Sequence, residues 1–198
     1  MAGKPTYDRE EVLQRALDVF WAKGFRGTSM KDLEAALGMH PGSIYAAFSS
    51  KEKLFEEALE RYAARSGERL EQTFAETPSP LQGLANHVRG LGSLAPADGP
   101  SRACMLVKTV LETPDDDPVV RRTAEALLRN VEASFADAFR RAQVQGELPA
   151  AADPDHLATW LQMQIIGLRA YAQRSDAGPK VRALAEDIAR SVEMLGDG

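Results

Sequence analysis

Apolar side chains recur every three or four positions along most of this chain, which is the spacing of amphipathic α-helices. The first such segment follows Asp8, where Leu13, Leu17 and Phe20 fall on one helix face. Asp8 is a suitable N-cap, and Gly24 stands where a helix would end in a residue with positive φ. A first helix over about residues 9–24 is therefore expected.

Two short helices are predicted next, separated by a tight turn. Thr28 or Ser29 is placed to cap a helix over residues 30–37, and Gly38 is placed to stop it. A third helix is expected to begin at Pro41, because a proline lacks the N–H that a first helical position leaves unbonded anyway. Three helices with a turn of two or three residues between the last two have the arrangement of a helix-turn-helix.

The helical pattern then continues to the end of the chain. Ser49, with Glu52 three residues later, predicts a capping box for a long fourth helix. Further apolar helices are expected after Ser79, Cys104, Asp117, Asp153 and Gly178. Since no stretch shows sustained period-two alternation, the prediction is an all-α fold of about nine helices. We expect a DNA-binding domain over residues 1–50 and a larger domain over residues 51–198, joined by the fourth helix.

Composition and charge are ordinary and exclude several classes of protein. The 198 residues are 44% hydrophobic and 27% charged, with a single cysteine and a net charge of −5. These values exclude a disulfide framework or a chain coated with nucleic-acid-binding charge. Residues 1–53 carry eight basic and seven acidic groups, so this part has a charge of +1 and the remainder −6. DNA binding must therefore be local. With no apolar leader or membrane-length segment, we expect a cytoplasmic protein.

The segment Thr28–Phe48, TSMKDLEAALGMHPGSIYAAF, closely resembles the DNA-binding signature of the TetR family of transcriptional regulators. The resemblance extends forward into Ser50–Phe55 and back to Ala16–Phe20 and Gly24–Phe25. It implies a homodimer that binds a near-palindromic operator in double-stranded DNA and responds to a small-molecule effector. Such a dimer acts most simply as a repressor that occupies a promoter.

The resemblance also implies roles for individual residues of the helix-turn-helix. Phosphate contacts would come from Thr28 or Ser29, Tyr45 and Lys51, with Lys4 on an arm that reaches the adjacent groove. Base reading would fall to the start of the recognition helix, at His40, Gly42 and Ser43, and to Ala46 or Ala47. Pro41 departs from the family pattern, which commonly has lysine there, so one expected phosphate contact is missing.

The resemblance implies that the last two long helices form the dimer interface, and their apolar faces supply candidates. The candidates are Leu161, Ile165, Leu168, Leu184, Ile188 and Leu195. The same residues could instead bury a central helix in a monomer. An apolar effector would be held by aromatic and sulfur-containing side chains of the larger domain. The candidates are Phe55, Leu59, Tyr62, Met105, Phe135, Phe139, Trp160, Met163 and Tyr171.

Cys104 is a second candidate for signal reception. It is expected at the start of a helix, where the positive end of the helix dipole favours thiolate, with Lys108 one turn away on the same face. Some TetR relatives with a cysteine at this helix start respond to electrophiles, oxidants or metal. The alternative is an inert buried thiol, since free cysteine is among the most buried residue types.

Two other classes of function remain as alternatives. His40, His87 and His156 fall on separate predicted helices without a metal-ligand or hydrolase motif, so we expect no metal, no cofactor and no enzymatic activity. Spacing alone does not exclude a Cys104–His87 pair in a cysteine-dependent enzyme. A helical interaction protein without DNA affinity is the other alternative.

Overall fold

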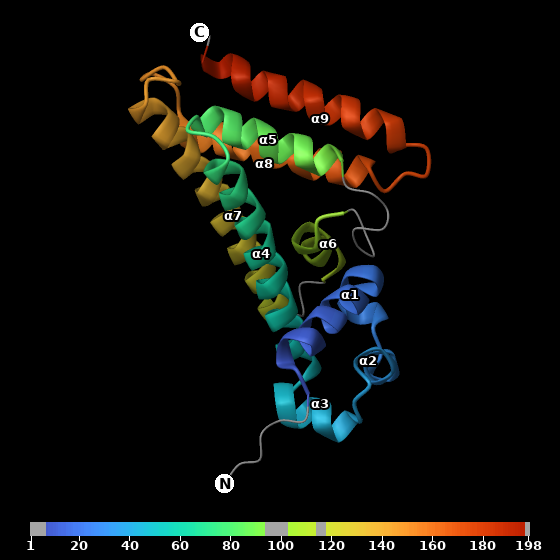
Figure 1. The fold of residues 1–198 in the computed structure, drawn as a ribbon. Coiled ribbons are helices and arrows are strands. Elements are labelled where there is room, and N and C mark those ends of the chain that lie inside the picture. Colours follow the sequence, from blue (N-terminus) through green and yellow to red (C-terminus); the bar gives the residue numbers. More distant parts are fainter. Residues whose placement is uncertain (1–6, 94–102, 114–117, 197–198) are drawn as a thin grey trace.

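The computed structural model describes residues 7–93, 103–113 and 118–196, which form nine α-helices and contain no strand (Figure 1). The all-α prediction is confirmed. The helices are α1 (Arg9–Gly27), α2 (Met30–Leu37), α3 (Pro41–Phe48), α4 (Lys51–Ala75), α5 (Pro80–Gly92), α6 (Met105–Glu112), α7 (Pro118–Val144), α8 (Pro154–Tyr171) and α9 (Gly178–Glu193), followed by a 3₁₀ turn at Met194–Gly196. Across these residues, no helix has the length and apolar character needed to cross a membrane.

The helices form two groups that are joined by long helices (Figure 1). Helices α1, α2 and α3 gather at one end, while α5, α8 and α9 lie at the other. Helices α4 and α7 pack side by side and run between the two ends, and the short α6 lies between α1 and the far group. The fold therefore places α6 where it touches both α1 and the larger helical group.

Most of the predicted helix ends are confirmed by capping contacts. Asp8 caps α1 by accepting hydrogen bonds from the N–H groups of the next turn, and Ser29 caps α2 in a reciprocal capping box with Asp32. Gly38 ends α2 in the left-handed conformation, with φ of 65°. Asp153 likewise caps α8. These ends depend on local chemistry, which is why the sequence predicted them.

The predicted cap of α4 was wrong by one residue. Ser50, not Ser49, accepts the hydrogen bond from the N–H of Lys53. Ser49 instead ends α3 with a positive φ of 66°, and its N–H donates to the carbonyl of Tyr45. The connection between α3 and α4 therefore contains two residues, Ser49 and Ser50, one more than the capping-box pattern suggested.

The course of α1 changes at Gly24, whose φ of 75° and ψ of 169° are non-helical. Only glycine adopts this region without strain. A Cβ here would also meet the carboxylate of Glu112, an exposed side chain that can move aside. Glycine is therefore required by the backbone conformation.

Two hydrophobic clusters stabilise the molecule, and α4 belongs to both. The N-terminal cluster joins α1, α2 and α3 to the first turns of α4, including Leu54, Phe55 and Tyr62, and extends to α6 and α7. The C-terminal cluster joins α5, α7, α8 and α9, with Leu70 contributed by α4. The predicted domain boundary at residue 50 falls inside the first of these clusters.

The structure corrects half of the predicted dimer interface. Leu161, Ile165 and Leu168 are at most 9% exposed and pack within the C-terminal cluster of their own chain. A side chain buried this way is not available to a second subunit. Helix α8 is apolar on two sides, and the sequence pattern could not distinguish the side that faces the chain's own core.

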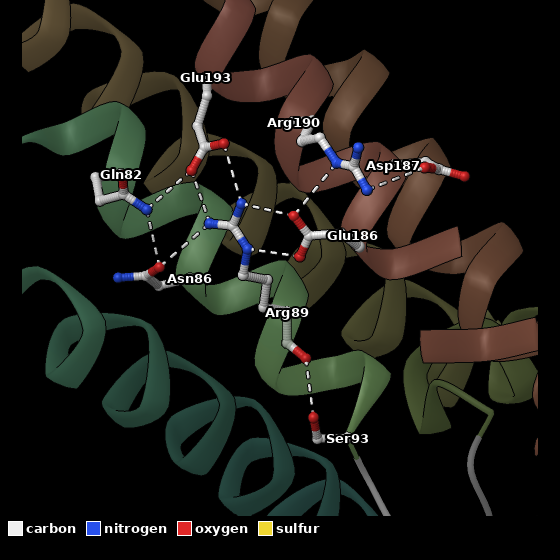
Figure 2. A network of polar contacts seen from close by, with 8 residues as sticks. All are labelled: Gln82, Asn86, Arg89, Ser93, Glu186, Asp187, Arg190 and Glu193. Atoms are coloured by element: carbon white, nitrogen blue, oxygen red, sulfur yellow. Dashed lines mark hydrogen bonds and ion pairs between the residues drawn. The ribbon is translucent and has the colours of Figure 1, made fainter. Parts of the chain in front are cut away.

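Helices α5 and α9 are held together by a polar network around Arg89 (Figure 2). The guanidinium of Arg89 donates two hydrogen bonds to Glu186, of 2.8 and 3.1 Å, and two to Glu193, of 2.7 and 3.0 Å. Gln82 also donates to Glu193. Arg89 lowers the pKa values of both glutamates, through hydrogen bonds first. Beside this network, a Cβ at Gly92 would clash with the Cβ of Ala185, so the two helices approach very closely there.

We expect Arg89→Met to lower the free energy of unfolding by about 1–2 kcal/mol, because bidentate pairing within a network is worth more than one exposed pair. Chemical denaturation at neutral pH measures this loss. Since the two glutamate pKa values are lowered in the folded state, the stabilisation is present above their ordinary value and is lost as the pH falls through the lowered values. The difference between wild type and variant should therefore disappear in acid.

Arg190→Met is the matched control, because Arg190 is exposed and lies 3.4 Å from Glu186 without bidentate geometry. We expect it to leave stability nearly unchanged. Equal losses from the two variants, or a loss from Arg89→Met that persists in strong acid, would contradict the role assigned to the network.

Candidate DNA-binding surface and effector cavity

Helix α3 presents one face to solvent and buries the other. Ile44 and Phe48 are each 1% exposed and anchor the helix in the N-terminal cluster. The opposite face is exposed and consists of His40, Gly42, Ser43, Tyr45 and Ala46. These are the residues that the sequence assigned to base reading and one phosphate contact, and the fold brings them together on one surface. Pro41 occupies the first turn, as predicted.

Arg9 holds α3 in place, a role that the sequence did not reveal. Its guanidinium donates to the carbonyl of Ala47 at 3.2 Å, near the end of α3, and lies 4.6 Å from the ring centroid of Phe48. It also forms an ion pair with Glu57 of α4 at 2.6 Å. Arg9 therefore connects α1, α3 and α4, and it fixes the angle at which α3 leaves the protein surface.

The predicted phosphate contacts differ in their exposure. Thr28 is 1% exposed and its hydroxyl donates to the carbonyl of Gly24 at 2.7 Å, so this residue serves the end of α1. Ser29 is exposed beside it, at the start of α2. Of the two alternatives, only Ser29 is exposed, and its hydroxyl donates to the carboxylate of Asp32 at 2.7 Å. Lys4 lies outside the described residues.

The side chains of Tyr45 and Lys51 differ in how far neighbouring side chains hold them in place. The Tyr45 side chain is 47% exposed. The Lys51 ammonium lies 4.4 Å from the ring centroid of Phe25, at the first turn of α4, and burial lowers its pKa. The ring of Phe25 thus holds the Lys51 ammonium at the first turn of α4.

A cavity lies inside the larger helical group, between α4, α5, α6, α7 and α8. Its volume of about 60 Å³ is far below the about 300–1,000 Å³ typical of pockets for drug-sized ligands. Among the described residues it is lined by Tyr62, Ser66, Arg69, His87, Leu91, Cys104, Leu106, Leu128, Val131, Phe135, Gln162, Ile165, Ile166 and Arg169.

Only three of the predicted effector residues line this cavity: Tyr62, Cys104 and Phe135. The others lie elsewhere, because the apolar residues of a helix are divided between core, cavity and surface by packing. Phe55, Leu59 and Met105 are buried in the N-terminal cluster, and Phe139 is buried in the C-terminal cluster. Met163 is 60% exposed, and Trp160 and Tyr171 line a surface groove between α8 and α9. Lys108 lines an adjoining groove along α6, which shares Cys104 and Ile166 with the cavity.

Cys104 is the N-cap residue of α6 and is half-buried beside the phenol of Tyr62. Burial first, and then the nearby thiol of Cys104, raises the pKa of Tyr62, so the phenol is neutral and available as a hydrogen-bonding group. The Lys108 ammonium, expected to face the thiol, instead donates to the carbonyls of Trp21 and Ala22, each at 3.0 Å.

These contacts attach α6 firmly to α1. The Lys108 bonds satisfy carbonyl groups just before the break in α1 at Gly24, and Trp21 returns a hydrogen bond of 2.8 Å from its indole N–H to the carbonyl of Ala103. Since Cys104 also lines the cavity, α6 has one end at the cavity wall and its body on a helix of the DNA-binding unit.

The sequence did not predict most of the polar residues that line the cavity, because the candidates were aromatic and sulfur-containing side chains. The unpredicted residues are Ser66, Arg69, His87, Gln162 and Arg169. The spacing of some of them along their helices could have identified them. Tyr62, Ser66 and Arg69 follow one another by four and three positions on α4, and Gln162 and Arg169 are seven apart on α8. Such spacing places polar groups on one helix face among apolar neighbours. No group of three or more potential metal-ligating side chains occurs in the part of the chain that the structure describes.

Comparison with known proteins identifies both parts of the chain. The family model for bacterial regulatory proteins of the tetR family matches residues 12–58, and the model for the tetracyclin repressor-like C-terminal domain matches residues 80–188. The HTH-type transcriptional repressor ComR of Escherichia coli K12 is 28% identical over 185 residues, which cover 92% of this chain and 88% of ComR.

Solved structures agree with this assignment. A cysteine-substituted form of the TetR family regulator CifR, in complex with a 26-base-pair operator, superposes with a TM-score of 0.86 at 32% identity, covering 96% of this chain and 99% of CifR. A regulator from Cytophaga hutchinsonii shares the fold, with a TM-score of 0.80 at 23% identity, covering 96% and 93% of the two chains. This chain belongs to the TetR family of bacterial transcriptional regulators.

Proposed function

We propose that this protein is a homodimeric transcriptional repressor that occupies an operator through α3 and leaves it when a small molecule enters the cavity beside α6. The observation that carries the first half is the exposed face of α3, above all Gly42. A Cβ at Gly42 would meet open space, so packing within the chain does not require glycine there. Glycine costs a helix roughly 0.5–1 kcal/mol relative to alanine. Close approach of α3 to the floor of a DNA groove accounts for that cost.

The roles of individual residues follow from this placement. His40, Gly42 and Ser43 are proposed to face base edges, with Ala46 or Ala47 against apolar base surface. Ser29, Tyr45 and Lys51 are proposed to contact phosphates and so to fix the register of the protein on the duplex. The operator complex of CifR and the repressor activity named for ComR support DNA binding and repression, respectively.

We propose that a ligand in the cavity causes release from the operator by displacing α6. A ligand that enlarges the cavity must displace part of its wall, and Cys104 at the start of α6 is part of that wall. Because α6 is hydrogen-bonded to α1 through Lys108 and Trp21, its displacement would tilt the unit that carries α3. The spacing of the two recognition helices in the dimer would then no longer match the operator, where half-sites lie about 34–36 Å apart.

The proposed dimer face is the outer surface of α8 and α9. A groove between these helices is lined by Trp160, Gly167, Tyr171, Leu184 and Ile188, and Leu184 is 40% exposed. Leu184, Ile188 and Leu195 were predicted at the interface, and they remain proposed there. Trp160, Gly167 and Tyr171 take the place of the three buried leucine and isoleucine residues of α8.

Enzymatic activity is not part of the proposal. His87 and Cys104 do line the same cavity, but burial and then the charges of Arg69 and Arg169 lower the pKa of His87 to about 4. An imidazole with so low a pKa is a weak general base at neutral pH. The relatives that match this chain are named as regulators of transcription.

The DNA contacts are tested by a gel shift on the promoter upstream of the protein's own reading frame. We expect Tyr45→Phe and Lys51→Gln each to weaken specific binding about five- to tenfold, because each removes a phosphate contact. Lys51→Gln should also reduce the slope of log affinity against log salt by about one per subunit.

Arg129→Gln is the control, since it removes a positive charge from the exposed surface of α7, outside both α3 and the proposed dimer face. It should leave both affinity and salt slope unchanged. Absence of any specific complex would leave the helical interaction protein as the better description, and unchanged binding by both test variants would refute the assigned contacts.

The dimer face is tested by Leu184→Asp, which places a charge on the proposed apolar seam. We expect the variant to sediment as a monomer at concentrations where the wild type is a dimer, because burying an unpaired carboxylate is costly. Val144→Asp is the control, as Val144 is 89% exposed at the end of α7. A dimeric Leu184→Asp protein would show that the subunits meet elsewhere.

Modification of Cys104 is proposed as a second route to release. N-ethylmaleimide should attach to this single cysteine and force α4 and α6 apart, weakening operator binding by about tenfold or more. Cys104→Ser should bind the operator normally and resist the reagent. Intact-mass measurement establishes complete modification, and full operator affinity of the modified wild type would show that Cys104 is an inert thiol.

A further inference from the structure

The cavity beside α6 contains two arginines, and none of its described lining residues is acidic. Arg69 enters from α4 and Arg169 from α8. The Arg169 residue is only 7% exposed, although arginine is rarely buried to this extent. Burial lowers the pKa of Arg69, and the nearby charge of Arg169 lowers it further. The two cations therefore raise the positive potential of a partly open cavity, with Arg69 exposed and Arg169 buried.

His87 lines the same cavity and is affected by both charges. Burial first, and then the charges of Arg69 and Arg169, lower the pKa of His87 to about 4. Two guanidinium groups on different helices thus act on the same imidazole, which lines the cavity with them. An anion at this position would be attracted by both arginines while His87 remained a neutral donor or acceptor.

The two arginines differ in the contacts that they make within the chain. Arg69 donates a long hydrogen bond of 3.4 Å to the hydroxyl of Ser66. Arg169 lies 6.0 Å from the ring centroid of Tyr62 and takes part in further interactions within the chain. A guanidinium has five N–H donors in a planar fork, so it can keep such contacts and still bind a carboxylate.

The rest of the lining is apolar, which limits the kind of anion that fits. Leu91, Leu106, Val131, Phe135 and Ile165 face the same space. A cavity of about 60 Å³ has room for about four water molecules, which corresponds to a molecule of only a few heavy atoms without rearrangement. An inorganic ion would leave the apolar wall without a partner, whereas a short hydrocarbon body would cover it.

We propose that the effector is a small organic carboxylate, bound with its carboxylate at Arg69 and Arg169 and its apolar body against the Phe135 side of the cavity. This inference deepens the proposed function and rests on it, since it names the chemical class of the releasing ligand. The sequence had predicted an apolar effector, and the two arginines add an anionic group to that description.

Carboxylate binding also connects the ligand to the DNA-binding unit. Arg69 belongs to α4, the helix that begins directly after α3, and Arg169 belongs to α8. An anion between them replaces repulsion by attraction and draws α4 and α8 together. Since Cys104 lines the same space, the ligand's body meets α6 while its charged end meets α4.

The test is isothermal titration of the full-length protein, without DNA, with butanoate, hexanoate and benzoate. Each is compared with its neutral amide, and inorganic phosphate serves as the anion without an apolar body. We expect at least one carboxylate to bind about ten- to a hundredfold more tightly than its amide, as charge-assisted hydrogen bonds imply. The same carboxylate should release the promoter fragment in the gel shift.

Arg69→Gln and Arg169→Gln should each abolish the preference for the carboxylate over the amide. Arg129→Gln is the charge-matched control, because Arg129 is exposed on α7 and does not line the cavity; it should bind like the wild type. If loss of the buried Arg169 makes that variant unstable, binding by Arg69→Gln still tests the proposal, because Arg69 is exposed. Binding of no carboxylate, equal binding of acid and amide, or unchanged binding by Arg69→Gln overturns the proposal. Operator binding by the ligand-free protein is measured separately, so its loss would refute the proposed function instead.

Discussion

Helix α4 is a single helix of 25 residues that belongs to both hydrophobic clusters, and this continuity constrains the whole molecule. An α-helix of this length spans roughly 37 Å and resists bending, because every turn is hydrogen-bonded to the next. Its first turns are packed into the core that holds α3, while its later turns carry Arg69 and Leu70 at the far group. A displacement of the later turns of α4 therefore changes the angle of its first turns, against which α3 packs.

The short α6 provides a second connection of a different kind. Whereas α4 is covalently continuous with the DNA-binding unit, α6 is joined to α1 by hydrogen bonds from Lys108 and Trp21 and by the close approach of Glu112 to Gly24. These contacts are directional, so they transmit a shift of α6 to α1. The cavity touches both connections, through Arg69 on α4 and Cys104 on α6.

Arginine side chains occur in two different surroundings in the C-terminal part of the molecule. Around Arg89, a cation is matched by the carboxylates of Glu186 and Glu193, and the network joins α5 to α9. Around Arg69 and Arg169, the described lining residues supply no acidic group. The carboxylates around Arg89 join two helices, whereas positive charge beside a cavity favours a ligand of the opposite charge.

The sequence by itself determined the helices, most of their ends and the exposed surface of α3. Those features depend on interactions within a few residues: Asp8 and Ser29 cap the helices that they precede, Gly38 adopts positive φ, and the small Gly42 lies next to Ser43 on the exposed face of α3. Even there, the choice between Ser49 and Ser50 as the cap of α4 depended on how tightly the chain turns. Tertiary structure alone decided which apolar face of α8 is buried, that Thr28 turns inward, and that Tyr62, Cys104 and Arg169 meet in one cavity. The reason is physical: a helix period assigns residues to faces, but only the packing of distant helices decides which face meets core, ligand or solvent.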